Sequence, residues 1–430
     1  MSELSPDPLS PREAARFPGA RTAPSSREKW LVLSVATLTH LFVVAVPYAA
    51  IPVLINEISH DLNMSLVEIG TMWSASSFAS LLMYLPGGII GDRFGVLRTL
   101  GVSCLLSGLA LFLRGFSTNY LMFIATSFAY SLVSALLPVN VHKTVSVYFH
   151  GKHLGIANGV VSMGMGVGAT LGALLSATYL SPWLGGWRNV LYLYGAASLV
   201  VTGLWWFTNR VTSRNIVPDR DAKVSSIMHA IRSVSRSRNI WLFSLMAIGR
   251  SVAVSGLVNY VALYLERFRG WQTASAAGAL TVVNAVSMVT VLPLALLSDR
   301  TASRIAIVLP GLLVGIVANA LFSFVGVPVI WLLLVLIGIF SDGYAAIFIT
   351  MIQESEGVGP LYSGTAIGLV FSMSNLASAI FSPVSYRLAE ANPDNPFLFW
   401  AGMGCISLLA LPFLKGVWRS PKTEKGMAIT

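Results

Sequence analysis

Three ionisable residues lie far inside long apolar stretches of the sequence: His40, Arg250 and Asp342. A charged side chain at the centre of a membrane helix costs about 2.5–3.5 kcal/mol on insertion scales, so it usually faces an internal cavity and has a role there. An arginine stays protonated, and its planar fork binds a carboxylate or phosphate through two hydrogen bonds. Arg250 is therefore predicted to bind an anion.

Asp342 and His40 are the candidate proton carriers. The ionisation of a buried carboxyl group depends on whether a cation lies close by, which suits Asp342 to this task. His40 could carry the proton or donate a hydrogen bond to a ligand, since the unperturbed pKa of histidine is about 6.5. Two alternatives stay open: a permanent Arg250–Asp342 ion pair that only joins two helices, and a neutral His40 satisfied by a hydroxyl such as that of Thr39. The pair and the anion site can also be stages of one cycle, in which the anion displaces Asp342 as Asp342 takes up a proton.

The elements that hold these residues are predicted to be membrane helices. Of the 430 residues, 55% are hydrophobic and 11% are charged, against roughly 25% charged in an average soluble domain. A span needs about 20 mostly apolar residues to cross a hydrocarbon core roughly 30 Å thick, and continuous runs of this length exclude barrel strands. The sequence contains twelve such runs: 30–55, 67–91, 97–115, 119–141, 155–181, 188–208, 239–265, 273–298, 303–325, 328–352, 362–388 and 396–415.

The distribution of basic residues predicts the orientation. Counted over alternate breaks, 22 of the 28 Lys and Arg residues fall on the side of the N-terminus and 5 on the other side. Both termini are therefore predicted to be cytoplasmic, in an inner or plasma membrane. The long basic break 209–238 is predicted to be a cytoplasmic linker between six-helix halves 30–208 and 239–415, with tails at 1–29 and 416–430. Within the linker, a short amphipathic helix on the inner leaflet and a solvated segment are equal alternatives.

Several other classes of protein are excluded by the same residues. The net charge of +10 does not indicate a nucleic-acid partner, because the basic residues lie in short breaks rather than on one polar face. Cys104 and Cys405 lie in apolar runs, which gives no support to a disulfide framework or a cysteine metal site. His142, His150 and His153 form a weak metal signal, and we interpret them as polar residues of the cytoplasmic side. No nucleophile–base pair or phosphate loop is evident, so neither an enzyme nor a cofactor is expected.

Two charged motifs occupy equivalent places in the two halves. The stretch from Gly88 to Arg98 follows the second helix, and a weaker copy from Ser298 to Arg304 follows the eighth. Glycines let helix ends approach closely, and the charges can pair in only one arrangement of the halves, so a conformational latch is predicted. The alternative is ordinary charges snorkelling at a helix end. The candidate latch residues are Gly88, Asp92, Arg93, Gly95, Arg98, Asp299, Arg300 and Arg304.

The two halves also match each other along the sequence. The Asp-Arg pairs are offset by 207 residues, and the Gly-x-x-x-Gly segments that open the fifth and eleventh helices, 155–159 and 364–368, by 209. Parallel repeats of six helices are typical of a transporter with its site between the halves. In the fifth helix, Gly159, Gly164, Gly168 and Gly172 form a small-residue ladder that predicts close contact with another helix.

The first motif, its copy and the twelve spans together resemble the major facilitator superfamily over residues 30–415. The resemblance implies an all-α membrane protein with twelve transmembrane helices in two pseudo-symmetric halves, and no cofactor. In that family helices 1, 4, 7 and 10 line a central cavity, so His40, Arg250 and Asp342 are expected to share one chamber. Many exporters of the family carry Gly-Pro in helix 5 and an Arg followed by glycines in helix 4. Here Ala173 follows Gly172 and residues 127–131 lack that Arg, which counts against a drug–proton antiporter.

Further candidates for substrate binding are Tyr264, Tyr130, Asn284 and Asn375. Tyr264 lies on the face of Arg250 near the outer end of its helix, where it could gate or belong to the interfacial aromatic belt; the others could instead join helices through hydrogen bonds. The remaining cavity walls are apolar, which suits a small organic anion such as a monocarboxylate better than a sugar. The sequence thus predicts a monomeric proton symporter of such an anion in the lipid bilayer. The alternative is a proton-coupled exporter of lipophilic or cationic compounds.

Overall fold

The computed structural model describes residues 26–149, 152–212, 234–300, 304–353, 355 and 359–414. Within these ranges, twelve helical stretches are long and apolar enough to cross a membrane, which confirms the predicted number. The first six are α2 (Ser26–Leu38), η1 (Thr39–Ala45) and α3 (Val46–Asp61) joined end to end, α4 (Leu66–Phe94), α5 (Val96–Gly115), α6 (Tyr120–Ser134) continued by α7 (Leu136–Tyr148), α8 (Lys152–Leu175) continued by η2 (Ser176–Leu180) and α9 (Ser181–Leu184), and α10 (Trp187–Val211).

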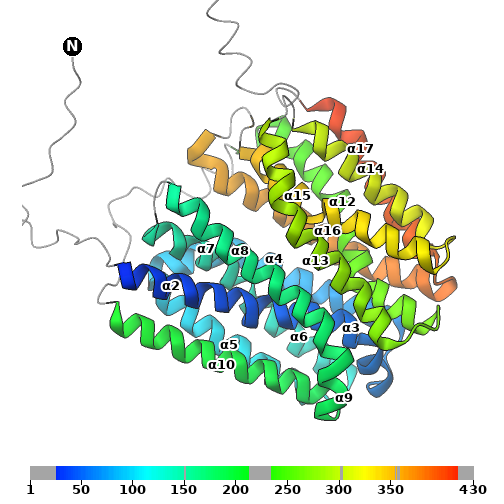
Figure 1. The fold of residues 1–430 in the computed structure, drawn as a ribbon, viewed down its shortest axis with the longest axis horizontal. Coiled ribbons are helices and arrows are strands. Elements are labelled where there is room, and N and C mark those ends of the chain that lie inside the picture. The colour runs from blue at the N-terminus through cyan, green and yellow to red at the C-terminus, as the bar shows by residue number, and fades with distance from the viewer. Residues whose placement is uncertain are drawn as a thin grey trace, which may run out of the picture.

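The second six follow residues 213–233, which lie outside the described part of the chain. They are α12 (Arg238–Arg267), α13 (Thr273–Arg300), α14 (Ile305–Phe322), α15 (Val327–Gln353), α16 (Gly359–Ala391), and α17 (Asn395–Ala410) with the short η3 (Leu411–Phe413). Figure 1 shows the two sets as separate bundles lying side by side, the first in blue to green and the second in green to red. Between the bundles, α4 packs on α16, α8 on α13 and α3 on α12.

Local sequence signals set several helix ends. Ser65 caps α4, since its hydroxyl accepts from the backbone N–H of Glu68 while the Glu68 carboxylate accepts from the Ser65 N–H, a capping box. The Asn119 side chain accepts from the N–H of Met122 and so begins α6. Between α4 and α5, Gly95 has φ of 89°, a backbone conformation that favours glycine. Gly95, one of the predicted latch residues, therefore forms the tight turn between α4 and α5.

The glycine ladder of α8 packs against the first span. A Cβ atom built on Gly164, Gly168 or Gly172 would lie within 2.9 Å of a backbone carbonyl oxygen of that span, from Thr37, Leu41 or Val46 in turn. A Cβ on Gly159 would meet nothing within 4 Å. The predicted close helix contact is therefore confirmed for three of the four glycines, and Gly159 lies outside it.

The halves close on each other on the side of the 61–66 and 267–273 loops, opposite to the predicted cytoplasmic side. The Ser74 hydroxyl on α4 donates to the carbonyl oxygen of Ala379 on α16, and α3 contacts both α12 and α13. At the other end of the first span, the main neighbours of α2 and η1 are helices of its own half, namely α5, α7, α8 and α10. On that side His142 of α7 and Met163 of α8 are exposed.

Gly70 is the closest point of this closure that we identify, because a Cβ there would lie 2.8 Å from Cβ of the buried Tyr386. Gly70→Val is expected to push α4 and α16 apart and to favour the state that is open at this side. Spin labels on the exposed positions His60 and Gln272, in a Cys405→Ser background, would report this in double electron–electron resonance as longer distances. Gly203→Val is the control, since a Cβ on Gly203 meets nothing within 4 Å. An unchanged distance distribution in Gly70→Val would contradict the expectation.

Candidate functional site

Arg250 lies in the middle of α12 and is half-buried. Its Nη2 donates to the carbonyl oxygen of Ser341 on α15 at 2.5 Å, and its Cζ lies 4.2 Å from the centroid of the Tyr344 ring. A cation over the face of an aromatic ring is attracted by the ring quadrupole. Asp342 follows Ser341 in α15, so Arg250 and the Asp342 backbone lie at one level of neighbouring helices, while the Asp342 side chain lies outside the described residues.

A small cavity adjoins the Arg250 side chain inside the C-terminal half. It has a volume of about 50 Å³ and is enclosed by residues of α12, α14, α15 and α17, including Asn319, Ser341 and Gly404. Ligand pockets are usually about 300–1,000 Å³, so this cavity has room for water rather than for an organic anion. A substrate could therefore reach Arg250 only from another direction or after a rearrangement of these helices.

His40 lies in the π-helical segment η1 and is 3% exposed. Its ring centroid is 5.3 Å from that of His142 on α7. The Thr39 hydroxyl does not satisfy it, because this hydroxyl donates to the Val35 carbonyl at 2.7 Å and accepts from the Trp205 Nε1–H at 2.8 Å. Thr39 is therefore not the partner of His40. The ring contact of His40 joins it to α7 and the contacts of Arg250 join it to α15, so each residue is held within its own half.

Two predicted substrate residues are engaged within their own halves. Tyr264 is 1% exposed; its hydroxyl donates to the Asp394 carboxylate and accepts from Arg269 Nε at 2.7 Å. It therefore lies in the interior of the C-terminal half rather than in an interfacial belt. The Tyr130 hydroxyl donates to the Val43 carbonyl at 2.8 Å and so joins α6 to η1.

The two predicted asparagines are both half-buried. The Asn375 amide donates to the Phe371 carbonyl at 3.0 Å within α16, so it does not join two helices through this bond. Asn284 lies on α13. The structure thus places the two asparagines on α13 and α16, the helices that pack against α8 and α4 of the other half.

The latch residues are described only in part. The described side chains do not include those of Asp92, Arg93, Asp299 and Arg300, and Gly88 also lies outside them. Arg98 is exposed, and Arg304 Nη1 lies 3.4 Å from the Ser298 hydroxyl.

The first motif also contains a packing contact that the sequence analysis did not identify. The Asn140 side chain of α7 donates to the Gly87 carbonyl at 3.0 Å, and a Cβ on Gly91 would lie 1.8 Å from Asn140 Oδ1. Gly91 therefore allows α4 to approach α7.

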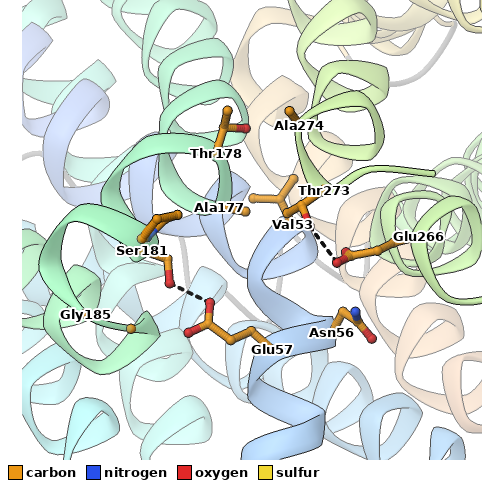
Figure 2. Close-up of a pocket in the computed structure, with 12 residues that line it drawn as sticks. Val53, Asn56, Glu57, Ala177, Thr178, Ser181, Gly185, Glu266, Thr273 and Ala274 are labelled. Atoms are coloured by element: carbon orange, nitrogen blue, oxygen red, sulfur yellow. Dashed lines mark hydrogen bonds between the residues drawn. The ribbon is translucent and has the colours of Figure 1, made fainter. Parts of the chain in front are cut away.

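A vestibule of about 780 Å³ lies between the halves at the closed side. Figure 2 shows Glu57 of α3 and Glu266 of α12 on its two sides. Glu57 accepts from the Ser181 hydroxyl at 2.6 Å and from the Trp187 N–H, at the start of α10, at 2.9 Å. Glu266 accepts from the Thr273 hydroxyl at 2.9 Å. The lining contains no Lys or Arg; its residues are Val53, Asn56, Glu57, Ala177, Thr178, Ser181, Pro182, Gly185, Gly186, Glu266, Thr273 and Ala274.

The sequence analysis did not identify the vestibule or the burial of one cation. Glu57 and Glu266 are 209 residues apart, the offset of the repeat, and that equivalence was the available signal. Arg114, one of the five basic residues counted on the side opposite the N-terminus, is 4% exposed. Its guanidinium lies 4.6 Å from the Phe123 ring centroid, and Nη2 is 3.6 Å from the Met72 sulfur. It lies in the last turn of α5, and its side chain turns inward onto the start of α6.

Known proteins resemble the chain in sequence to a limited degree. The probable galactarate/D-glucarate transporter GarP of Escherichia coli is 28% identical over 157 residues, which cover 35% of this chain and 34% of that protein. The probable sulfoacetate transporter SauU of Cupriavidus necator is 22% identical and covers 46% of this chain and 45% of that protein. The cis,cis-muconate transport protein of Acinetobacter baylyi is 21% identical and covers 84% of this chain and 87% of that protein. The chain thus matches only about a third of GarP and half of SauU.

Two solved structures share the fold. A bacterial homologue of the human lysosomal transporter Spinster, in an inward-facing and unoccupied conformation, gives a TM-score of 0.72 at 16% identity, covering 93% of this chain and 100% of that one. The nucleoside transporter NupG gives a TM-score of 0.71 at 12% identity, covering 90% and 98%. The model of the Major Facilitator Superfamily matches residues 33–382. The chain therefore belongs to the major facilitator superfamily and is an integral, multi-pass membrane transporter.

Proposed function

We propose that this transporter carries a small organic anion together with a proton, by rocking of its two halves, as a monomer in the cell membrane with both termini cytoplasmic. The observation that carries the proposal is Arg250, a permanent cation held at mid-span between α12 and α15. A charged side chain at this depth usually faces an internal cavity and has a role there, and a carboxylate that binds a guanidinium forms charge-assisted hydrogen bonds with it.

The contacts of Arg250 suit it to exchange partners. The Ser341 carbonyl is a neutral acceptor, and a carboxylate is a stronger one for a guanidinium. Tyr344 covers one face of the guanidinium and would keep the fork oriented while a ligand binds its edge. Binding must be stronger in one conformation than in the other for the anion to shift the equilibrium.

The relatives support an anionic substrate class. The transporters of galactarate or D-glucarate, of sulfoacetate and of cis,cis-muconate are each named for organic anions. The identities of 21–28% make these names a guide to a class and not to a solute. We therefore extend our sequence-based proposal of a monocarboxylate-like anion to small carboxylates and sulfonates in general.

The remaining parts of the proposal follow from the sequence. Asp342, next to Ser341, and His40 are the proton carriers. The clusters around Asp92 and Asp299 bias the two conformations as latches. Residues 209–238 form the cytoplasmic linker between the two six-helix halves.

A ligand screen followed by transport tests this function. Purified protein is heated with D-glucarate, sulfoacetate, cis,cis-muconate, acetate, inorganic phosphate and a cationic dye, and the shift in Tm is measured. Anions that raise Tm then enter a counterflow assay in proteoliposomes. Stabilisation and counterflow by at least one carboxylate or sulfonate are expected. Stabilisation by the dye alone, or counterflow by none of the anions, would overturn the proposal.

The vestibule favours a second candidate, the export of cationic compounds. Two carboxylates and no cationic side chain line it, so its potential would attract cations leaving the membrane. Against this, both carboxylates already accept hydrogen bonds from neighbouring residues. If the protein exports the dye and still does so when Arg250 is replaced, the result would favour the exporter.

A further inference from the structure

His40 has an unsatisfied polar ring in a tightly packed place. Neither ring nitrogen has a hydrogen-bond partner among the described residues; the Val161 backbone of α8 lies near the ring without making a hydrogen bond of good geometry. The polar groups around it are otherwise satisfied, since Thr39 and the Val43 carbonyl have their own partners. A buried polar group left without a partner needs an explanation. The π-helical turn that holds it is a rare element, often found at functional sites.

His142 places an exposed imidazole ring against the buried ring of His40. The two rings meet edge to face, at an interplanar angle of 77°, and His142 is exposed on the predicted cytoplasmic side. His142 Nδ1 lies 3.0 Å from the Asn158 amide oxygen on α8. An amide oxygen only accepts hydrogen bonds, so Nδ1 carries a hydrogen and Nε2 is the nitrogen that can take up a further proton.

Among the described side chains of the spans that pack against η1, no carboxylate lies close to the two rings. The helix α4, which packs against α7, also carries Asp92, whose side chain lies outside the described ones. On the described spans that pack against η1, the carboxylates are Glu28, Glu57 and Asp61, at least 12 residues from His40 along the same span, or about 18 Å. Tyr130 of α6 also contacts η1. The other titratable groups on the elements that pack against η1 are Lys143 beside His142, Cys104, Arg27, Lys29, Tyr48, His60, Arg98, Arg114, Tyr148, Arg188, Tyr192, Tyr194 and Arg210, with Lys152 and His153 outside the described side chains. Two imidazolium rings in contact would repel each other, so the pair holds one proton at a time.

We propose that His40 and His142 together form the proton-binding site of the N-terminal half, with His142 as the member that exchanges protons with the cytoplasm. A hydronium ion gives its proton to the free ring nitrogen of His142 and leaves as water, and no other bond changes. The charge on His142 then lies in edge contact with the His40 ring, so protonation of one ring opposes protonation of the other. This inference rests on the proposed proton-coupled function and adds His142 to it.

A titration of the histidine rings tests the pair without any solute. The full-length protein, with ¹³C-labelled histidine in nanodiscs, is followed by NMR between pH 5 and 9, and its 6 histidines are assigned by single His→Gln variants. His142→Gln is expected to move the titration midpoint of His40 by at least half a pH unit. His60→Gln is the control, because His60 is exposed near the opposite end of the same span. A His40 midpoint that His142→Gln leaves in place would overturn the proposal.

Transport separates this inference from the proposed function. In proteoliposomes, His142→Gln is expected to lose at least ten-fold of the accumulation of cis,cis-muconate driven by a pH gradient, and to keep counterflow within two-fold of wild type; His60→Gln keeps both. His142→Asn is made in parallel, so that a folding defect of one variant does not decide the result. Two results would overturn the inference. The first is gradient-driven accumulation that persists in both His142 variants, and the second is wild-type protein that shows counterflow but no gradient-driven accumulation. Counterflow by none of the screened anions in the wild type would overturn the proposed function instead, and the NMR result would still decide whether the two rings titrate as a pair.

Discussion

Replacing Arg250 with glutamine is expected to lower the affinity for the anionic substrate by about 100-fold or more, because truncating one partner of a buried charged contact costs several kcal/mol. Glutamine can still donate to the Ser341 carbonyl, so the α12–α15 contact has a neutral substitute. Arg250→Lys keeps the charge and loses the planar fork over Tyr344; a loss of about ten-fold is expected. The measurement is counterflow of whichever carboxylate or sulfonate raises the Tm of the wild type.

The controls separate binding from folding. Arg210 is an exposed cation in the last turn of α10, and Arg210→Gln should leave affinity and Tm unchanged. The Tm of each Arg250 variant without solute shows whether the fold is intact. Anion stabilisation and counterflow that are equal in Arg250→Gln and the wild type would reject Arg250 as the anion site. The function would then have to rest on another cation.

The arrangement of the helices could be predicted from composition and periodicity to a large extent. Runs of apolar residues are long because the hydrocarbon core sets a minimum length, and so the twelve spans are readable without any contact information. The small-residue ladder of α8 also predicted a close helix contact, because only glycine allows the approach seen at Gly168 and Gly172. The partner of that ladder, the first span, could not be predicted, because spacing on one helix does not say which helix faces it.

The candidate site was less predictable. The position of a residue in the sequence gives its depth along a helix, but it does not give the neighbouring helix that its side chain contacts. The family pattern places His40 and Arg250 in one chamber, which stays a prediction; the contacts that the sequence could not give are those of His40 with His142 and of Arg250 with Ser341 and Tyr344. The burial of Arg114 could not be predicted either, because a long side chain at a helix end can turn toward water or inward. In each case a tertiary contact decided the outcome.

The second large effect is expected where α8 meets the first span. A Cβ on Gly172 would lie 2.5 Å from the Val46 carbonyl oxygen, and one on Gly168 would lie 2.7 Å from that of Leu41. These neighbours are backbone atoms of a helix in the core of the N-terminal half, so they cannot turn aside as a side chain could. Gly168→Ala and Gly172→Ala are each expected to destabilise the protein by about 1–3 kcal/mol, and the double variant should not be recovered as a folded monomer.

Gly159→Ala should have the opposite sign, which makes it a control on the same helix. A Cβ there meets nothing within 4 Å, and replacing an unconstrained helical glycine with alanine typically stabilises by about 0.4–1 kcal/mol. Tm in detergent and the monomer fraction on size exclusion measure all three single variants. Helix propensity alone predicts that every one of them gains stability. A drop in Tm for Gly168→Ala and Gly172→Ala together with a rise for Gly159→Ala therefore assigns the loss to the contact with the first span, and a rise in all three would mean that α8 and that span do not touch as described.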